Sequence, residues 1–176
     1  MRRRFTWIIW LVLVALTASS PLWGSKSTFL TSVFAGQLDP TQWFVFNALG
    51  LFPLYFFILA RNDQQPHLRS LLYLSGMVLG GFIIFPLEVT SKTKPQPLTK
   101  LNLTLLVSMD LLFIGLLIWA LIFGDWSLYS ESYRNDLFVY VMTWDFFAFL
   151  GVLTVKIIAS YKTYFNNIMN DKTSAL

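Results

Sequence analysis

The feature that most constrains this chain is a series of long apolar stretches. The clearest runs from about Leu101 to Phe123 and contains one charged residue, Asp110. Similar stretches cover about residues 5–23, 42–60, 70–87 and 137–159. A helix of about 20 apolar residues spans the hydrocarbon core of a bilayer. The sequence therefore predicts an all-α fold, a polytopic transmembrane helical bundle with about five spanning helices in a single membrane-embedded domain, residues 1–176.

The composition agrees with this prediction. Hydrophobic residues make up 56% of the chain and charged residues 12%. That share of charge is about half of what a soluble domain carries. Lipid is therefore the expected solvent for most of the surface.

The first stretch, about residues 5–23, has more than one interpretation. Arg2, Arg3 and Arg4 precede it, as in a cleaved signal peptide, but its tryptophan and isoleucine content favours a retained helix. With five spans the basic residues divide almost evenly between the two sides, and only the arginine triplet favours a cytoplasmic N-terminus. If the first stretch does not span, the basic residues gather on one side, which makes four spans the alternative.

Missing residue types exclude several functions. The chain has no cysteine and a single histidine, His67, which lies in a short polar loop. No phosphate-binding glycine loop, nucleophile elbow or zinc-binding HExxH motif is present. We therefore expect a non-enzymatic protein with no catalytic residues and no metal. The net charge of +4 indicates loops and tails near anionic lipid headgroups and no nucleic-acid partner.

Two aspartates, Asp110 and Asp145, lie well inside predicted spans. A carboxylate there costs several kcal/mol unless it is paired, protonated or hydrated. If the last two spans form an antiparallel hairpin, the two carboxylates differ in depth by about 7–8 Å, close enough to share a water or a proton without touching. Three interpretations stay open: a hydrogen bond to a neighbouring helix such as that of Asn47, an ion or proton site, and an anchor for a pigment or ligand.

Gly76, Gly80 and Gly81 place small residues close together on the third predicted span. Small residues let another helix backbone approach closely in a membrane. The partner is either a helix of the same chain or another subunit. Glu88, at the end of this span, is expected to pair with Lys92 or Lys94.

Three segments resemble an uncharacterised family of small integral membrane proteins of cyanobacteria and chloroplasts. The first includes Phe29-Leu30, Gly36, Asp39-Pro40 and residues 46–54 (FNALGLFPL). The others are residues 79–82 (LGGF) and 138–146 (FVYVMTWDF). The resemblance implies a thylakoid or plasma membrane of a photosynthetic organism, and it implies no enzymatic activity.

Together these observations favour a small membrane subunit, or an assembly or accessory factor, of a larger photosynthetic or electron-transfer complex. Chlorophyll or carotenoid would then lie at its periphery through the partner complex. The alternative is a small proton- or ion-coupled transporter that uses Asp110 and Asp145. A pigment-binding membrane protein is the second alternative.

Overall fold

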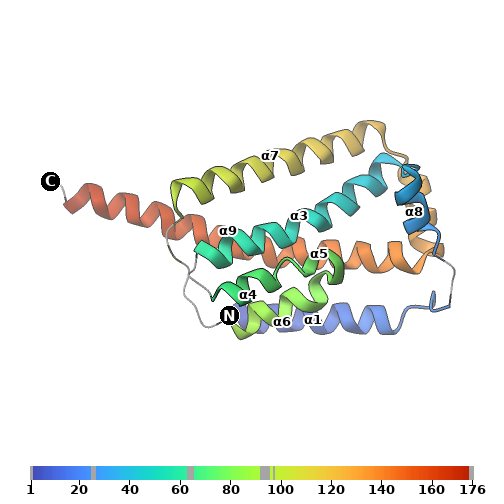
Figure 1. Ribbon diagram of the computed structural model, residues 1–176, viewed down its shortest axis with the longest axis horizontal. Helices are drawn as coiled ribbons and strands as arrows, with labels where there is room; N and C mark the ends of the chain where they lie inside the picture. Colours follow the sequence, from blue (N-terminus) through green and yellow to red (C-terminus); the bar gives the residue numbers. More distant parts are fainter. Residues whose placement is uncertain (1, 25–26, 63–65, 92–95, 97, 175–176) are drawn as a thin grey trace.

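The computed structural model describes residues 2–24, 27–62, 66–91, 96 and 98–174, and these residues form helices and no strand. Figure 1 shows α1 (Arg2–Ala18), α2 (Phe29–Ala35), α3 (Pro40–Asn62), α4 (His67–Leu72), α5 (Gly76–Leu79), α6 (Gly81–Thr90), α7 (Lys100–Phe123), α8 (Trp126–Asn135) and α9 (Leu137–Ser174). The all-α prediction is confirmed.

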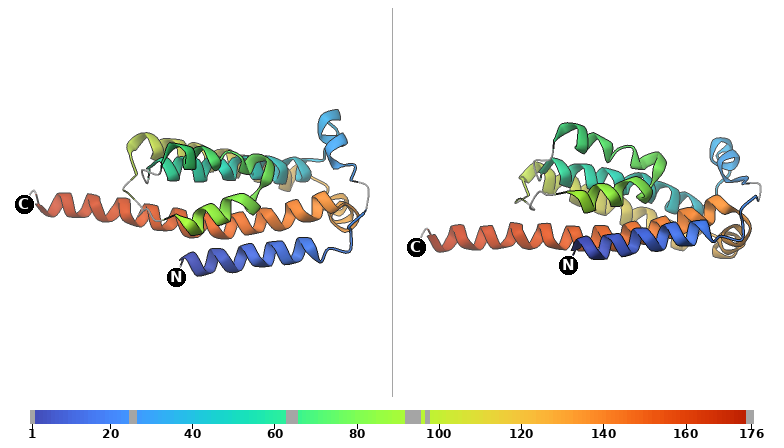
Figure 2. Two further views of the ribbon diagram at one scale, coloured as in Figure 1. Left: turned by 60° about the horizontal axis from the view of Figure 1, so that its bottom comes forward. Right: turned by 90° about the horizontal axis from the view of Figure 1, so that it is seen from below.

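Three described helices are long and apolar enough to cross a membrane: α3, α7 and the Leu137–Tyr164 part of α9. This supports the prediction of a membrane protein, but it does not confirm five spans. Helix α1 has 17 residues, about 25 Å of helix, and it lies along α6 and α9 (Figure 2). The N-terminus and the C-terminal end of α9 lie at the same end of the bundle (Figure 1).

The predicted third span, residues 70–87, is not one continuous helix. Helices α4 and α5 run in one direction, the chain reverses at Gly80, and α6 returns (Figure 1). The reason is local: Gly80 has φ 59° and ψ −149°, a region that essentially only glycine adopts. We call residues 67–90 the helical hairpin, Gly80 and Gly81 its tip, and the ends near His67 and Thr90 its base.

Hydrogen bonds between its two legs close the hairpin at the base. Arg69 of α4 donates to the carbonyl of Leu87 at 2.5 Å and to the hydroxyl of Thr90 at 2.6 Å. Helix α1 runs antiparallel to α6, packs on its outer side and is hydrogen-bonded to it at two points. Arg3 donates to the carbonyl of Ser91 at 2.6 Å, and Trp10 donates to the carbonyl of Phe82 at 3.2 Å.

Aromatic side chains from three helices, α3, α6 and α9, form the centre of the bundle. Phe52 and Phe56 of α3 contact Phe149 of α9 at ring-centroid distances of 5.4 and 5.9 Å. Phe85 of α6 packs on the same ring at 5.1 Å. Helix α3 is therefore central, and 56% of its most apolar 18-residue stretch is buried. Helix α7 packs mainly on α3, and only 11% of the corresponding stretch is buried. Most of the surface of α7 faces outward.

The end of the bundle opposite the termini is closed by short helices. Gly36, with φ 66°, ends α2 in the left-handed conformation. The carboxylate of Asp136, just before α9, accepts hydrogen bonds from Ser27, Thr28 and Phe29. Asp39 accepts a hydrogen bond from the backbone N–H of Asp125 at the start of α8. These carboxylates fix the loops to the helix ends.

Candidate functional site

The tip of the helical hairpin places a buried carboxylate against a helix N-terminus. Both oxygens of Asp145, on α9, accept a hydrogen bond from the backbone N–H of Gly81, at 2.9 and 3.1 Å. Gly81 is the first residue of α6, where backbone N–H groups lack partners within the helix. The helix N-terminus carries a partial positive charge that stabilises an anion. This contact compensates part of the cost of burying Asp145, which is 5% exposed.

The three glycines named by the sequence all contact this chain's own segments. A Cβ atom on Gly80 would overlap the Asp145 carboxylate, and one on Gly81 would overlap Asp145 and Phe85. A Cβ atom on Gly76 would overlap the side chain of Ile84 on the opposite leg of the hairpin. Close internal packing therefore accounts for Gly76, Gly80 and Gly81 without another subunit.

A pocket of about 570 Å³ lies beside the hairpin tip. Of the described residues that line it, Asp145 is the only charged one and Asn47 carries the only polar amide side chain. Asn47 donates its Nδ2 to the carbonyl of Trp43 at 2.7 Å, which leaves its Oδ1 available to a ligand. The other lining residues are apolar or glycine: Phe46, Leu49, Gly50, Leu51, Leu54, Gly76, Met77, Val78, Leu79, Gly80, Phe82, Leu112, Leu116, Phe138, Val141 and Met142.

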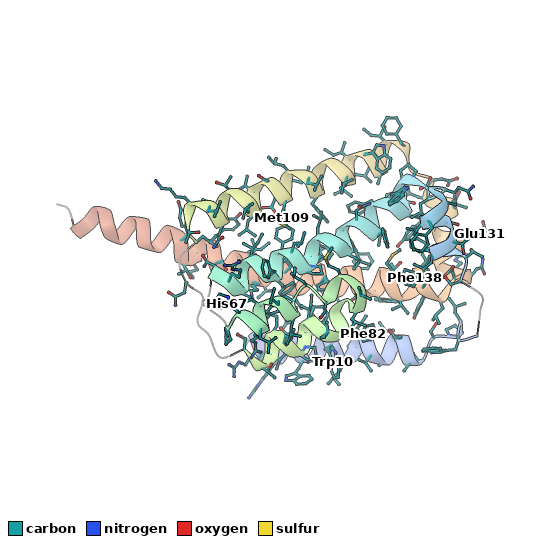
Figure 3. All side chains as sticks on the ribbon, in the orientation of Figure 1. Trp10, His67, Phe82, Met109, Glu131 and Phe138 are labelled. Atoms are coloured by element: carbon teal, nitrogen blue, oxygen red, sulfur yellow. The ribbon has the colours of Figure 1, made fainter. Side chains whose placement is uncertain are left out.

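The pocket draws its walls from α3, α5, α6, α7 and α9. In Figure 3 the labelled Phe82 lies on the hairpin near Trp10 of α1, and Phe138 lies near the α8 end of α9. His67 lies at the opposite end of the molecule from Glu131. The pocket thus lies beside the hairpin tip and is partly open to the outside, where Met77, Val78 and Leu79 are each more than half exposed.

Asp110 occupies a different site. Its Oδ1 accepts a hydrogen bond of 2.7 Å from the hydroxyl of Tyr55 on α3, and Tyr161 of α9 also interacts with it. Asp110 does not line the pocket at the hairpin tip. The two aspartates therefore have separate partners, and the structure does not bring them together as a shared proton site.

A buried ion pair, formed by Glu88 and Lys156, lies toward the base of the hairpin. Lys156 Nζ contacts Glu88 Oε1 at 2.6 Å, with the two side chains 2% and 4% exposed. The hydroxyl of Tyr73 donates to the same oxygen at 2.6 Å. The ammonium also lies 5.5 Å from the ring centre of Phe56, within cation–π range. This network joins α4–α6 to α9.

This pairing was not expected from the sequence. Glu88 was predicted to pair with Lys92 or Lys94, and those two residues lie outside the described residues. The structure gives Glu88 a different partner, Lys156. A signal was present, because Lys156 falls inside the predicted last span, where a cation needs a counter-charge.

A second, more apolar pocket of about 640 Å³ lies among α3, α7, α8 and α9. Its ring-bearing walls include Phe113, Trp126 and Trp144. Tyr129 of α8 also lines it and shares a hydrogen bond of 2.6 Å with Thr143. Burial raises the pKa of the Tyr129 phenol. Tyr129 and Thr143 bond to each other, whereas the buried Nε1 of Trp144 has no hydrogen-bond partner among the described residues, so the pocket combines apolar walls with one free donor.

Comparisons with protein-family models, with curated proteins and with solved structures found no match to this chain. The resemblance to a cyanobacterial and chloroplast family therefore stays a prediction. Among the described residues no group of three or more His, Asp or Glu side chains is placed to hold a metal ion.

Proposed function

We propose that this chain is a small, non-enzymatic integral membrane protein that moves a proton or cation by way of the Asp145 pocket. The observation that carries the proposal is the contact of the Asp145 carboxylate with the Gly81 N–H at the tip of a broken, reversing helix. Irregular backbone at membrane depth is tolerated where it is buried in protein or lines a cavity. In secondary transporters, half-helix ends of this kind surround the substrate and ion sites.

The chemistry follows from the hydrogen bond. The carboxylate of Asp145 uses both oxygens on one N–H donor, which leaves lone pairs directed elsewhere. A proton or a cation that enters the pocket binds to this carboxylate and weakens its bond to Gly81. The hairpin tip is thereby freed from α9, while the Glu88–Lys156 pair keeps the rest of the hairpin in place. Site occupancy and hairpin position are then linked.

Basic residues support a specific orientation. If residues 67–90 form a re-entrant hairpin that enters and leaves on one side, α1, α3, α7 and α9 make four spans. The end that holds both termini then carries most of the basic side chains that the structure describes: Arg3, Arg4, Arg61, Arg69, Lys100 and Lys162. Arg134 lies at the other end, in α8. By the positive-inside rule we place both termini in the cytoplasm.

The test is reconstitution of the purified chain into liposomes that contain a pH-sensitive dye. We expect an imposed membrane potential to drive a proton or cation flux in the wild type and in Asp110→Asn. Asp145→Asn should abolish that flux, because asparagine can accept from Gly81 but cannot ionise. A flux that survives Asp145→Asn, or its absence in the wild type, would overturn the proposal.

A second candidate is a membrane subunit or assembly factor of a larger photosynthetic or electron-transfer complex, in a thylakoid or plasma membrane. The observation that favours it is the outward face of α7, where Leu111, Leu121 and Ile122 are each more than half exposed. Such a face contacts either lipid or a partner protein. The resemblance to the cyanobacterial and chloroplast family supports the partner, which would also bring any chlorophyll or carotenoid.

Extraction in a mild detergent followed by native electrophoresis tests this second candidate. Co-migration with a larger, pigmented complex would support it, and co-migration should weaken when Leu111 and Ile122 on α7 are replaced by bulky tryptophans. A colourless species of the mass of the chain alone would contradict it.

A further inference from the structure

We propose that the pocket at the hairpin tip binds a hydrophobic, monovalent organic cation that takes the place of a proton on Asp145. This inference rests on the proposed function and names the class of ligand for the same site. It is carried by the charge, the walls and the volume of the pocket.

The charge of the pocket fits a single positive charge. Asp145 is the only charged side chain among the described residues of its lining. The nearest buried acid on α6, Glu88, is already paired with Lys156, and Asp110 on α7 is bonded to Tyr55. A monovalent cation therefore neutralises the pocket, whereas a divalent cation leaves an uncompensated charge in an apolar environment, which is costly.

The number of oxygen atoms argues against a bare metal ion. Calcium needs six to eight oxygen ligands and magnesium about six in strict geometry. The polar side-chain groups of the pocket are the Asp145 carboxylate and the Asn47 amide. The carboxylate oxygens already accept from Gly81, and the Asn47 amide, which donates its nitrogen to Trp43, adds one further oxygen. Too few oxygens remain to replace the hydration shell of an inorganic ion.

The walls provide what an organic cation needs instead. Phe46, Phe82 and Phe138 line the pocket, and aromatic rings attract organic cations through their faces. Met77 and Met142 add flexible, polarisable contacts. The volume of about 570 Å³ falls in the range of about 300–1,000 Å³ typical of small-molecule sites. An apolar body with one positive charge matches this combination.

The probe is tetraphenylphosphonium, an apolar ion with one positive charge that carries no proton of its own. Binding to the purified full chain in detergent would be measured by equilibrium dialysis and by proton release in weakly buffered solution. We expect saturable binding, release of a proton, and an apparent affinity that falls as the pH is lowered. Asp145→Asn should weaken binding at least about tenfold, and Asp110→Asn should leave it unchanged.

A pair of glycine variants tests the location independently of charge. Gly50 lines the pocket and Gly115, on α7, does not. A Cβ atom on either meets nothing within 4 Å, so both positions accept a larger side chain. Gly50→Phe should fill the pocket and abolish saturable binding, while Gly115→Phe should bind as the wild type does.

The outcomes separate this inference from the proposed function. Binding that is equal in wild type, Asp145→Asn and Gly50→Phe would overturn the inference. A proton or metal-ion flux that depends on Asp145 without any tetraphenylphosphonium binding would also overturn it, while leaving the proposed function intact. Site-specific binding without any flux in liposomes would support the inference and overturn the transport function.

Discussion

The tip and the base of the helical hairpin are both fastened to α9 by a carboxylate, but the two contacts differ in kind. At the base, Glu88 meets a full opposite charge on Lys156 and a hydroxyl on Tyr73, with both ionic side chains almost completely buried. At the tip, the one hydrogen-bond donor that Asp145 meets among the described residues is the backbone N–H of Gly81, and Asp145 borders a pocket. A fully paired charge holds structure, whereas a partly compensated charge beside a cavity is available to a ligand.

The largest expected loss of stability follows from disrupting the Glu88–Lys156 ion pair at the base of the hairpin. Lys156→Met leaves Glu88 buried without its cation, which should cost about 3–5 kcal/mol of unfolding free energy. Denaturant-induced unfolding in detergent measures the loss. Adding Glu88→Gln to Lys156→Met removes the orphaned charge and should recover part of it. Unchanged stability in Lys156→Met would contradict the structural role of this pair.

The next largest loss of stability is expected from a substitution at the hairpin tip. Gly80→Ala forces a side chain into a backbone conformation reserved for glycine and into the Asp145 carboxylate. We expect a loss of about 1–3 kcal/mol in the same unfolding assay. Gly115→Ala is the matched control, because its Cβ meets open space within a helix, and it should stay within about 1 kcal/mol of the wild type. Equal behaviour of the two variants would argue against a strained reversal at Gly80.

A smaller effect on stability distinguishes the tip from the base most directly. Asp145→Asn keeps an acceptor for the Gly81 N–H, so unfolding free energy should change by about 1 kcal/mol or less. Flux and cation binding should nevertheless be lost. If Asp145→Asn destabilises the protein as strongly as Lys156→Met, then Asp145 has the same structural role as Glu88.

The smallest expected effect concerns Asp125, a solvent-exposed carboxylate at the N-terminus of α8. Asp125 is fully exposed before α8, and bonds from Ser127 and from the backbone N–H of Leu128 hold its pKa below its usual range. A lowered pKa in the folded state means that the stabilisation is present above the unfolded pKa, about 3.9, and is lost as the pH falls through the folded value.

Hydrogen exchange of the first-turn amides of α8 measures this contribution between about pH 5 and pH 2. Protection should decrease toward low pH in the wild type, and the pH dependence should disappear in Asp125→Asn. A pH-dependent loss of similar size in Asp125→Asn would assign the effect to another group.

The sequence predicted the helices better than their arrangement. Long apolar runs have a single physical explanation in a chain with so little charge, so α3, α7 and the start of α9 were predictable within a few residues. The end of α9 was not, because the helix continues to Ser174, well past the predicted end at about residue 159. The hairpin was not, because its apolar residues 70–87 are as hydrophobic as a span. Only the backbone angles of Gly80 distinguish a reversing hairpin from a crossing helix.

The candidate site was predicted in part. Asp145, Asn47, Gly76 and Gly80 were singled out, and all four line one pocket. Asp110 was grouped with Asp145 because both interrupt apolar runs, yet it bonds to Tyr55 and lies outside that pocket. Lys156 was missed as a partner of Glu88, because helices far apart in the sequence bring the two together.

By itself, then, the sequence determined that this chain is helical, that it has helices long and apolar enough to cross a membrane, and that Asp110 and Asp145 interrupt these apolar helices and need compensation there. These properties follow from hydrophobicity and charge, which belong to each residue alone. The tertiary structure decided which carboxylate is paired, which one borders a cavity and where the chain turns back. Those depend on distances between segments far apart in the chain, and such distances exist only once the helices have packed.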